Sequence, residues 1–243
     1  PGDRVFGIVP GGAYAEYIVV HEREAAKTPE VLDDEAAAAV PEAFITAYDA
    51  LVLRGGLLPG ERVLIHAVGS GVGTAGLQVA KALGCHVTGT SRTANKLERA
   101  EALGLDAGLL VPGIEALDKA LASHEPYDVV LDLVGGNYVG GTLPHMAARG
   151  RVVVVGLTGG ARSELPLATL LSKRLSVIGT VLRSRPLEEK IQAADLLRRT
   201  LSPWLSRKMV RPVVERTLPL DEAGEAHRLL ARNSTFGKVL LAV

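Results

Sequence analysis

The sequence predicts an α/β fold in which a doubly wound parallel sheet is flanked at each end by a β-containing segment. Three observations predict it. From Arg62 onward, apolar strands alternate with helices at intervals of about twenty to thirty residues, which is the βαβ pattern. Several of these strands are apolar at nearly every position, as is typical of parallel strands buried on both faces. The segments before Arg62 and from residue 183 onward differ in sequence pattern from this central part, and we expect the two flanks to join.

The N-terminal flank is expected to contain a piece of an antiparallel β unit. Strands are predicted over residues 3–8 and 13–21, separated by a loop rich in proline and glycine. An alanine-rich helix then starts at the acidic run 33–35, and a longer helix over residues 42–55 ends at a glycine pair.

The central part supplies the strands of the parallel sheet, which we predict over residues 62–68, 86–91, 107–111, 127–135, 151–157 and 175–182. The helices between them are predicted over residues 74–83, 94–103 and 114–123. In the C-terminal flank, a long amphipathic helix over residues 185–206 precedes a strand, a helix over 221–233 and a final strand over 237–243.

The composition indicates a globular protein that acts on small molecules. Of the 243 residues, 47% are hydrophobic and 22% are charged, enough for one large core or two modest ones. The 27 basic and 27 acidic residues balance, so we expect no binding of nucleic acid or an anionic membrane by charge. A single cysteine, Cys85, excludes an internal disulfide, and we expect a cytoplasmic protein. Because no uninterrupted apolar run of about 18 residues is present, we expect no membrane span.

A glycine-rich turn follows the first strand of the predicted sheet. Gly71, Gly73 and Gly76 form the pattern G-x-G-x-x-G between a strand and a helix, the context expected of a dinucleotide-binding fingerprint. Without Cβ atoms at the first two glycines the backbone can approach a pyrophosphate, and Gly76 lets the helix lie close to the strand. A P-loop is excluded because Leu77-Gln78 stands where a Lys-Ser/Thr pair is needed. A tight turn that holds no ligand is the alternative.

The end of the second strand favours NADP(H) over NAD. An acid in this position normally accepts the ribose hydroxyls of NAD, but here Ser91 is followed by Arg92, with Lys96 one helical turn further on. A guanidinium and an ammonium group pair with a 2′-phosphate, which a carboxylate would repel. The sequence therefore predicts NADPH as the cofactor, with solvated surface cations as the alternative interpretation.

Several stretches resemble one known family across the whole chain. "PEAFITAYDAL", "LPGERVLIHAVGSGVG", "QVAKALG", "GRVVVVGL", "LLSKRLSVIGTVLRSRP" and "FGKVLLAV" are similar, in this order, to the zeta-crystallin-type NADPH:quinone oxidoreductases of the medium-chain dehydrogenase/reductase superfamily. The resemblance implies a GroES-like substrate domain with a remnant at residues 1–43 and a return at 183–243, and a Rossmann domain over residues 44–182. It also implies that most of the N-terminal half of the substrate domain lies outside this sequence.

The same resemblance implies which residues contact the cofactor. Thr46 matches a threonine beside the nicotinamide, and no aromatic stacking at the adenine is implied because Val111-Pro112 stands where many relatives have a tyrosine. The implied set is Thr46, Ser70, Gly71, Val72, Gly73, Ser91, Arg92, Lys96, Gly156, Leu157, Thr158, Leu182, Arg183 and Asn233.

We expect no metal site. Zinc-dependent relatives have a cysteine where this chain has Glu42, and none of the six histidines shows a ligand spacing such as H-E-x-x-H. His66 lies within an apolar strand and is predicted to be a core histidine. Glu42 is a candidate for moving a proton or orienting substrate, with a helix-start carboxylate as the alternative. Ser70 does not lie in a G-x-S-x-G elbow, which argues against a serine hydrolase.

The resemblance implies zinc-independent reduction of a quinone or a related enone by hydride transfer from NADPH, and no single side chain is expected to be catalytic. An enoyl-thioester reductase on the same fold and a non-catalytic, NADPH-binding, crystallin-like protein are the alternatives. The valine-rich strand over residues 175–182 is expected at a sheet edge, and pairing through it predicts a homodimer.

Overall fold

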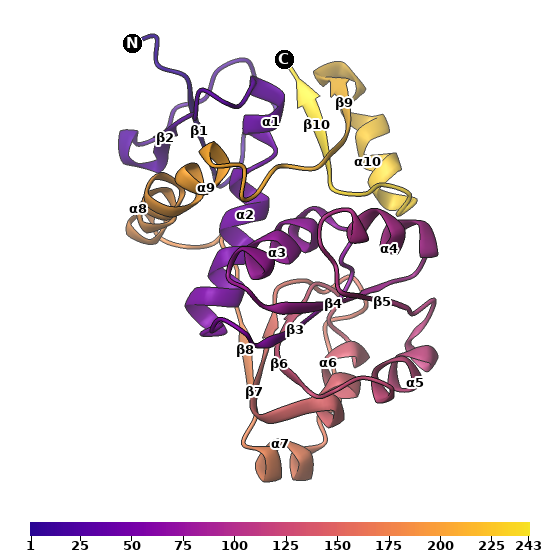
Figure 1. Cartoon of the computed structure of the whole chain (residues 1–243). Helices are drawn as coiled ribbons and strands as arrows, with labels where there is room; N and C mark the ends of the chain where they lie inside the picture. The colour runs from indigo at the N-terminus through magenta and orange to yellow at the C-terminus, as the bar shows by residue number, and fades with distance from the viewer. The chain divides into compact units, whose positions relative to one another are not determined.

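The computed structural model describes residues 1–243, which divide into two compact units. Ala47–Thr180 forms the first, which we call the sheet unit (Figure 1). Pro1–Thr46 and Val181–Val243 together form the second, which we call the terminal unit. The limits that the sequence predicts for the central domain, residues 44 and 182, lie close to those of the sheet unit.

The sheet unit contains six parallel strands in the order β5-β4-β3-β6-β7-β8 (Figure 1). The strands are β3 (Arg62–Ile65), β4 (His86–Ser91), β5 (Ala107–Leu110), β6 (Tyr127–Asp132), β7 (Met146–Val154) and β8 (Ser176–Gly179). The chain runs outward from β3 to one edge and then from β6 to the other. This is the strand order of a doubly wound Rossmann sheet, so the predicted fold class is confirmed.

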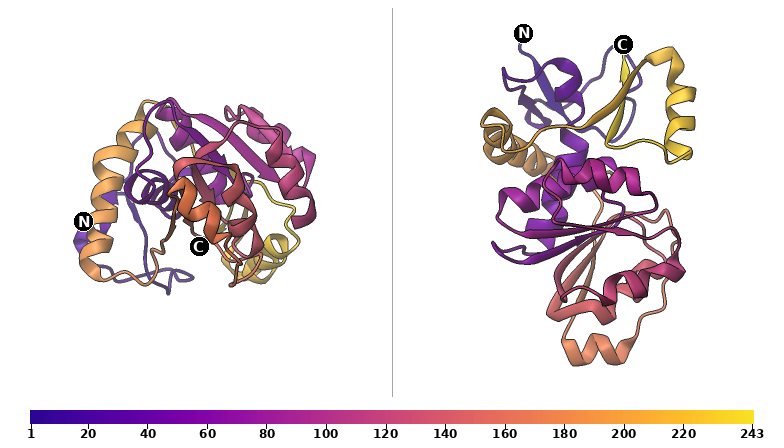
Figure 2. Two further views of the ribbon diagram at one scale, coloured as in Figure 1. Left: turned by 90° about the horizontal axis from the view of Figure 1, so that it is seen from below. Right: turned by 45° about the vertical axis from the view of Figure 1, so that its right-hand side comes forward.

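The α-helices of the sheet unit are α3 (Gly71–Ala82), α4 (Ala94–Glu101), α5 (Leu117–Ala122), α6 (Asn137–Thr142) and α7 (Leu167–Lys173). It also contains the π-helix η2 (Asp49–Arg54) and the short 3₁₀ helices η3 (Ile114–Ala116) and η4 (Leu143–His145). Figure 2 shows α3 and α4 on one face of the sheet and α5 and α6 on the other. Since both faces are covered, the central strands are apolar throughout: Val63, Leu64, Ile65, Val129, Val130 and Leu131 all have 0% exposure.

One buried hydrophobic cluster joins the strands to α5, α6 and η4. Its members are Leu64, Leu109, Val111, Leu117, Leu121, Tyr127, Val130, Val139, Leu143, Met146, Val152 and Leu175. From β7, the guanidinium of Arg151 donates to the carbonyls of Gly55 and Gly56 over 2.6 and 2.9 Å and to the carboxylate of Glu61 over 2.8 Å. These bonds satisfy the carbonyls of the two glycines that follow η2 and hold this end of the helix on the sheet.

The terminal unit is built from both ends of the chain. Its strands form two pairs, β1 (Val5–Gly7) antiparallel to β2 (Ala25–Lys27) and β9 (Val214–Pro219) parallel to β10 (Lys238–Ala242). Its helices are α1 (Asp34–Ala38), the first part of α2 (Pro41–Tyr48), α8 (Leu187–Leu196), α9 (Ser202–Ser206) and α10 (Ala223–Ala231), with short turns η1 (Glu22–Glu24), η5 (Leu197–Leu201) and η6 (Leu220–Glu222). Arg198 donates to the carbonyl of Ala25 over 2.7 Å, and Thr217 donates to Glu35 over 3.1 Å. The two flanks therefore join, as the sequence predicts.

One predicted strand was wrong, and two helices of the structure were not predicted. Residues 13–21 form no strand, and β2 lies further on, at Ala25–Lys27. In this stretch Tyr17 is 89% exposed and Val19 is 99% exposed, because no neighbouring strand of the chain covers them. Helices α6 and α7 were not predicted, since the glycines of "NYVGGT" weaken the helical pattern of α6 and α7 is only 7 residues long.

The helical stretch Asp34–Arg54 is long and apolar enough to cross a membrane, with 21 residues and a mean hydropathy of 1.4. Acidic residues interrupt this stretch, so it is not the uninterrupted apolar run that the sequence analysis looked for, and the expectation of no membrane span stays a prediction. In the structure, 67% of its apolar window is buried inside the protein, and core helices of globular proteins meet the same criteria of length and composition.

Candidate functional site

The turn between β3 and α3 has a helix start that presents free N–H groups. Ser70 is the N-cap residue, and its Oγ atom accepts the N–H of Gly73 over 3.0 Å. The N–H groups of Gly71 and Val72 are the first two of the helix and have no partner within it, so they are available to an anion. The strand order diverges between β3 and β6, and open α/β sheets bind ligands at this switch point.

The glycines of this turn are needed for packing within the protein, which the sequence alone did not indicate for Gly73. A Cβ atom on Gly73 would lie 2.5 Å from the carbonyl oxygen of Ala67 and 2.7 Å from that of Val68. The expectation that the missing Cβ of Gly73 makes room for a pyrophosphate is therefore corrected, because the backbone of the turn already fills that space. A Cβ atom on Gly76 would lie 2.7 Å from Leu131 in β6. This confirms that Gly76 lets α3 lie close to the sheet.

The end of β4 presents one exposed cation. Ser91 is the last residue of the strand, and its Oγ atom accepts the N–H of Thr93 over 3.2 Å, which leaves the hydroxyl hydrogen able to donate elsewhere. Arg92 follows and is exposed. Lys96, in the first turn of α4, is only 7% exposed and has interactions within the protein. Of the two predicted cations, Arg92 is the one that solvent reaches.

The loop after β7 lies against the end of β6. The N–H of Gly156 donates to the carbonyl of Asp132 over 3.3 Å, and the N–H of Gly159 donates to that of Val134 over 2.7 Å. Leu157 and Thr158 between them are exposed. Because the carboxyl ends of parallel strands meet at one edge of a sheet, this edge brings together most of the predicted residues: Ser70, Gly71, Val72, Gly73, Ser91, Arg92, Gly156, Leu157 and Thr158.

Four predicted contacts belong to the terminal unit, and their contact with a cofactor stays a prediction. Thr46 is buried and its Oγ1 atom has no hydrogen-bond partner, which is unusual for a buried hydroxyl and fits a ligand contact. Leu182 is buried, and Arg183 is exposed and donates to the carbonyl of Pro10 over 3.3 Å. Asn233 follows α10 with a φ of 51°, a left-handed position that by itself favours asparagine.

The sequence analysis missed Tyr138 and Glu115 at this edge. Burial raises the pKa of Tyr138, the charge of Arg92 acts to lower it, and the charges of Glu115 and Asp132 act to raise it. The phenol of Tyr138 is therefore within electrostatic reach of all three charged groups. It brings an aromatic ring near Arg92 although Val111-Pro112 lacks the tyrosine of many relatives. No sequence signal indicated this, because Tyr138 lies on the unpredicted helix α6.

Asp132 was also missed, although its position at the end of an apolar strand was a usable signal. It is 0% exposed. Its Oδ1 atom accepts the N–H of Val134 over 2.8 Å and that of Gly135 over 2.9 Å. Asp132 therefore fixes the loop between β6 and α6, against which the loop after β7 rests.

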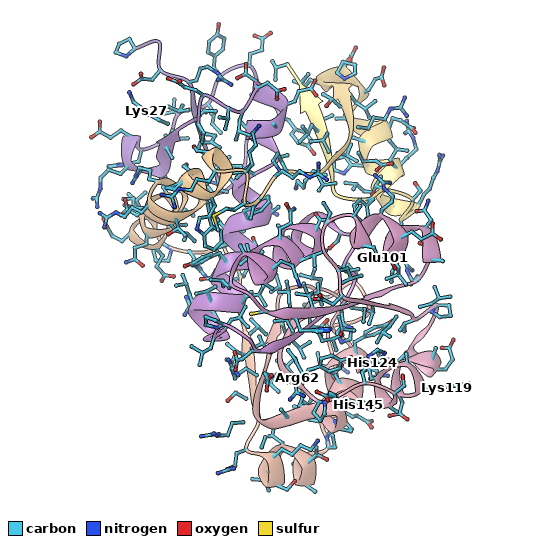
Figure 3. The ribbon with its side chains drawn as sticks, viewed as in Figure 1. Lys27, Arg62, Glu101, Lys119, His124 and His145 are labelled. Carbon is cyan, nitrogen blue, oxygen red and sulfur yellow. The ribbon has the colours of Figure 1, made fainter.

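The histidines do not come together in a metal centre. His66 is 0% exposed, with one ring nitrogen bonded to Thr90 and the other to Thr142, so the prediction of a core histidine is confirmed. His145 pairs with Asp118 over 2.9 Å, and Figure 3 labels His145 and His124 in the region of α5. No group of three or more His, Cys, Asp and Glu side chains lies close enough to hold a metal ion. Glu42 is an exposed residue in the first turn of α2, and its role stays a prediction.

A doubly wound sheet with a free helix start at its switch point defines an α/β protein of the dinucleotide-binding class. The sequence model of the family described as zinc-binding dehydrogenase matches residues 71–199. Human quinone oxidoreductase is 31% identical over 245 residues, which cover 99% of this chain and 72% of the human protein. The chain therefore belongs to the medium-chain dehydrogenase/reductase superfamily, with the quinone oxidoreductases of zeta-crystallin type as its relatives.

Two further matches bear on function. The quinone oxidoreductase of Thermus thermophilus, solved alone and in complex with NADPH, is 33% identical with a TM-score of 0.85, and the match covers 100% of this chain and 77% of that one. The polyketide synthase GfsB of Streptomyces halstedii is 33% identical over 246 residues, which cover 100% of this chain and 4% of that protein. The chain spans only 65% of one solved dehydrogenase that it matches. At the level of the family, it is an NAD(P)-dependent, quinone-oxidoreductase-like protein.

Proposed function

We propose that this chain binds NADPH at the carboxyl edge of the sheet and reduces a quinone or a related enone. The observation that supports this most strongly is the start of α3, where the N–H groups of Gly71 and Val72 are free at the switch point of the sheet. When bound, NADPH supplies a hydride from its nicotinamide ring.

In this proposal, the residues of the sheet unit bind and orient the cofactor. The two free N–H groups and the partial positive charge at the start of α3 hold the diphosphate. The hydroxyl of Ser91 donates to the 2′-phosphate, and the exposed guanidinium of Arg92 pairs with it through two N–H groups. No side chain is assigned as a proton donor, because a reduced quinone can take its protons from water.

The experiment that tests this proposal combines binding with turnover. Titration calorimetry with NADPH and NADH gives the two dissociation constants, and NADPH oxidation is then followed by absorbance with a benzoquinone as acceptor. We expect NADPH to bind more tightly than NADH and to be consumed when the quinone is added. Absence of binding by either dinucleotide would refute the proposal at its first step.

A second candidate is the reduction of an enoyl thioester. The observation that favours it is the match of the whole chain to part of a polyketide synthase, because polyketide chains are built as thioesters. Consumption of NADPH with crotonyl thioester but not with the quinone would replace the first proposal by this one. Tight NADPH binding without consumption by either acceptor favours a non-catalytic binding protein.

We further propose that two copies of the chain pair through β8. This strand ends the sheet, so one of its edges has no partner in the chain, and Val177 is 38% exposed on it. Alignment of two such edges would give a continuous sheet and an isologous dimer. Sedimentation as a monomer at micromolar concentration would remove this proposal.

A further inference from the structure

His66, the residue directly after β3, is bonded at both ring nitrogens inside the sheet unit. Its Nδ1 atom lies 3.1 Å from the hydroxyl of Thr90 in β4, and its Nε2 atom lies 2.9 Å from the hydroxyl of Thr142 at the end of α6. All three side chains are buried, with exposures of 0% for His66, 2% for Thr90 and 0% for Thr142. His66 therefore joins β4 to α6 at the end of β3.

The neighbouring hydrogen bonds fix the direction of each donor. The hydroxyl of Thr142 donates to the carbonyl of Tyr138 over 2.7 Å, so it can only accept from the Nε2–H of His66. With the hydrogen on Nε2, the Nδ1 atom carries none and accepts the hydroxyl hydrogen of Thr90. The Oγ1 atom of Thr90 in turn faces the N–H of Ala67, over a long 3.4 Å. Ala67, Thr90, His66, Thr142 and Tyr138 thus form one chain of hydrogen bonds, which we call the relay. Each donor hydrogen in it has one acceptor.

One end of the relay is Ala67, the residue that fixes the conformation of the glycine turn. Ala67 has a φ of 55°, a left-handed conformation that is strained for a residue with a side chain. Its carbonyl accepts the N–H of Ser70 over 3.0 Å and lies where a Cβ atom on Gly73 would clash. The place of Ala67 therefore determines where α3 begins and where the N–H groups of Gly71 and Val72 point.

The other end of the relay reaches the helix on the opposite face. The rings of His66 and Tyr138 meet edge to face, with 5.1 Å between their centres and an angle of 84° between their planes. The charged or titratable groups that act on this region are Asp132 from β6, Arg92 after β4 and Glu115 from η3.

We propose that His66, held by Thr90 and Thr142, is a positioning residue that keeps the glycine turn in the conformation that binds the diphosphate. The inference rests on the proposed function and adds a residue to it that contacts no part of the cofactor. A neutral imidazole is needed, because only that form donates at one nitrogen and accepts at the other. A histidine that merely filled the core would stabilise the fold without any specific effect on the diphosphate.

Conservative changes at the two threonines separate these roles. Thr90→Val and Thr142→Val keep the shape of each side chain and remove its hydroxyl, whereas Thr90→Ser and Thr142→Ser keep the hydroxyl. Each variant is titrated calorimetrically with NADPH, which carries the diphosphate, and with adenosine 2′-phosphate, which reaches only the site of Arg92. Thermal unfolding without ligand shows that each variant is folded.

We expect the valine variants to weaken NADPH binding about fivefold to tenfold, because each loses the two hydrogen bonds that its threonine hydroxyl makes in the relay. Their affinity for adenosine 2′-phosphate should stay within about twofold of the unaltered chain, and the serine variants should bind both ligands normally. Valine variants that bind NADPH normally, or that lose both ligands in equal proportion, would overturn the inference while leaving the proposed function intact. An unaltered chain that binds neither ligand would overturn both.

Discussion

The Oγ atom of Ser70 accepts the backbone N–H of Gly73 over 3.0 Å, so the third N–H of α3 is already bonded by the protein itself. The helix start therefore offers two N–H groups to a diphosphate, those of Gly71 and Val72. Ser70 therefore caps the helix and, in the proposed complex, would stand beside the diphosphate.

Replacement of Ser70 separates capping from binding. Ser70→Ala should lower the free energy of unfolding by about 1 kcal/mol, because the N-cap bond is lost. Ser70→Asp should keep the cap and the stability, since aspartate is an equally good N-cap residue. Its carboxylate would however repel the diphosphate, and NADPH affinity should fall at least about tenfold. Denaturant unfolding and calorimetry measure the two effects, and a stable Asp variant with unchanged NADPH affinity would show that the phosphates do not lie here.

A methyl group at Gly73 should destabilise the sheet unit. Gly73→Ala brings Cβ to 2.5 Å from the carbonyl oxygen of Ala67, where only a shift of the backbone can relieve the clash. We expect a loss of about 2–4 kcal/mol in the free energy of unfolding. Gly179→Ala is the matched control, because nothing lies within 4 Å of its Cβ position. Equal stability of the two variants would mean that the turn is looser than the structure shows.

Removal of the charge of Glu115 should strengthen NADPH binding. The carboxylate of Glu115 and the guanidinium of Arg92 both act on Tyr138, so the acid stands near the proposed site of the 2′-phosphate. Glu115→Gln should raise the affinity for NADPH about twofold to fivefold and leave NADH binding unchanged, because a partly screened like charge is removed. Glu101→Gln, an exposed acid on α4, serves as the control. A gain in affinity for both dinucleotides would exclude an effect through the 2′-phosphate.

The burial of His66 predicts a loss of stability in mild acid. Burial lowers the pKa of His66 from 6.5 to about 4, although the charge of Asp132 acts in the opposite direction. Between these values the unfolded chain takes up a proton that the folded chain does not, so stability is complete above pH 6.5 and falls as the pH approaches 4. The loss should reach about 3 kcal/mol. Unfolding free energies measured at several pH values should show this slope, and His66→Gln should flatten it; an equal slope in both would assign the acid sensitivity to other groups.

The sequence predicted the parallel sheet because its strands carry their own signal. Residues 129–131 are apolar and fully buried on both faces, as is typical of a strand covered by helices on each side. Residues 13–21 are rich in the aromatic and β-branched residues of strands, but such a stretch needs a neighbouring strand, and Val19 is 99% exposed in this chain. A central strand is thus predictable from its own residues. A strand that forms only when a neighbouring strand is present is much less so.

The candidate site likewise contains residues that were predictable from local sequence and residues that were not. The glycine turn and Arg92 were predictable, because a turn that must leave N–H groups free and a strand end that lacks an acid are both local features. Tyr138 and Glu115 were not, since they reach the end of β4 only through the packing of α6 and η3. The role of Gly73 was misread for a related reason: the atoms that exclude a Cβ there belong to Ala67 and Val68, whose turn becomes visible only in three dimensions.

The preference for NADPH over NADH is the central claim, and calorimetry on the unaltered chain and on Arg92→Ala tests it most directly. We expect the unaltered chain to bind NADPH more tightly, and Arg92→Ala to lose about tenfold to a hundredfold of its NADPH affinity with no change for NADH. Lys119→Ala, which removes an exposed cation on α5, should change neither constant. Equal losses for both dinucleotides in Arg92→Ala, or tighter binding of NADH by the unaltered chain, would contradict the account.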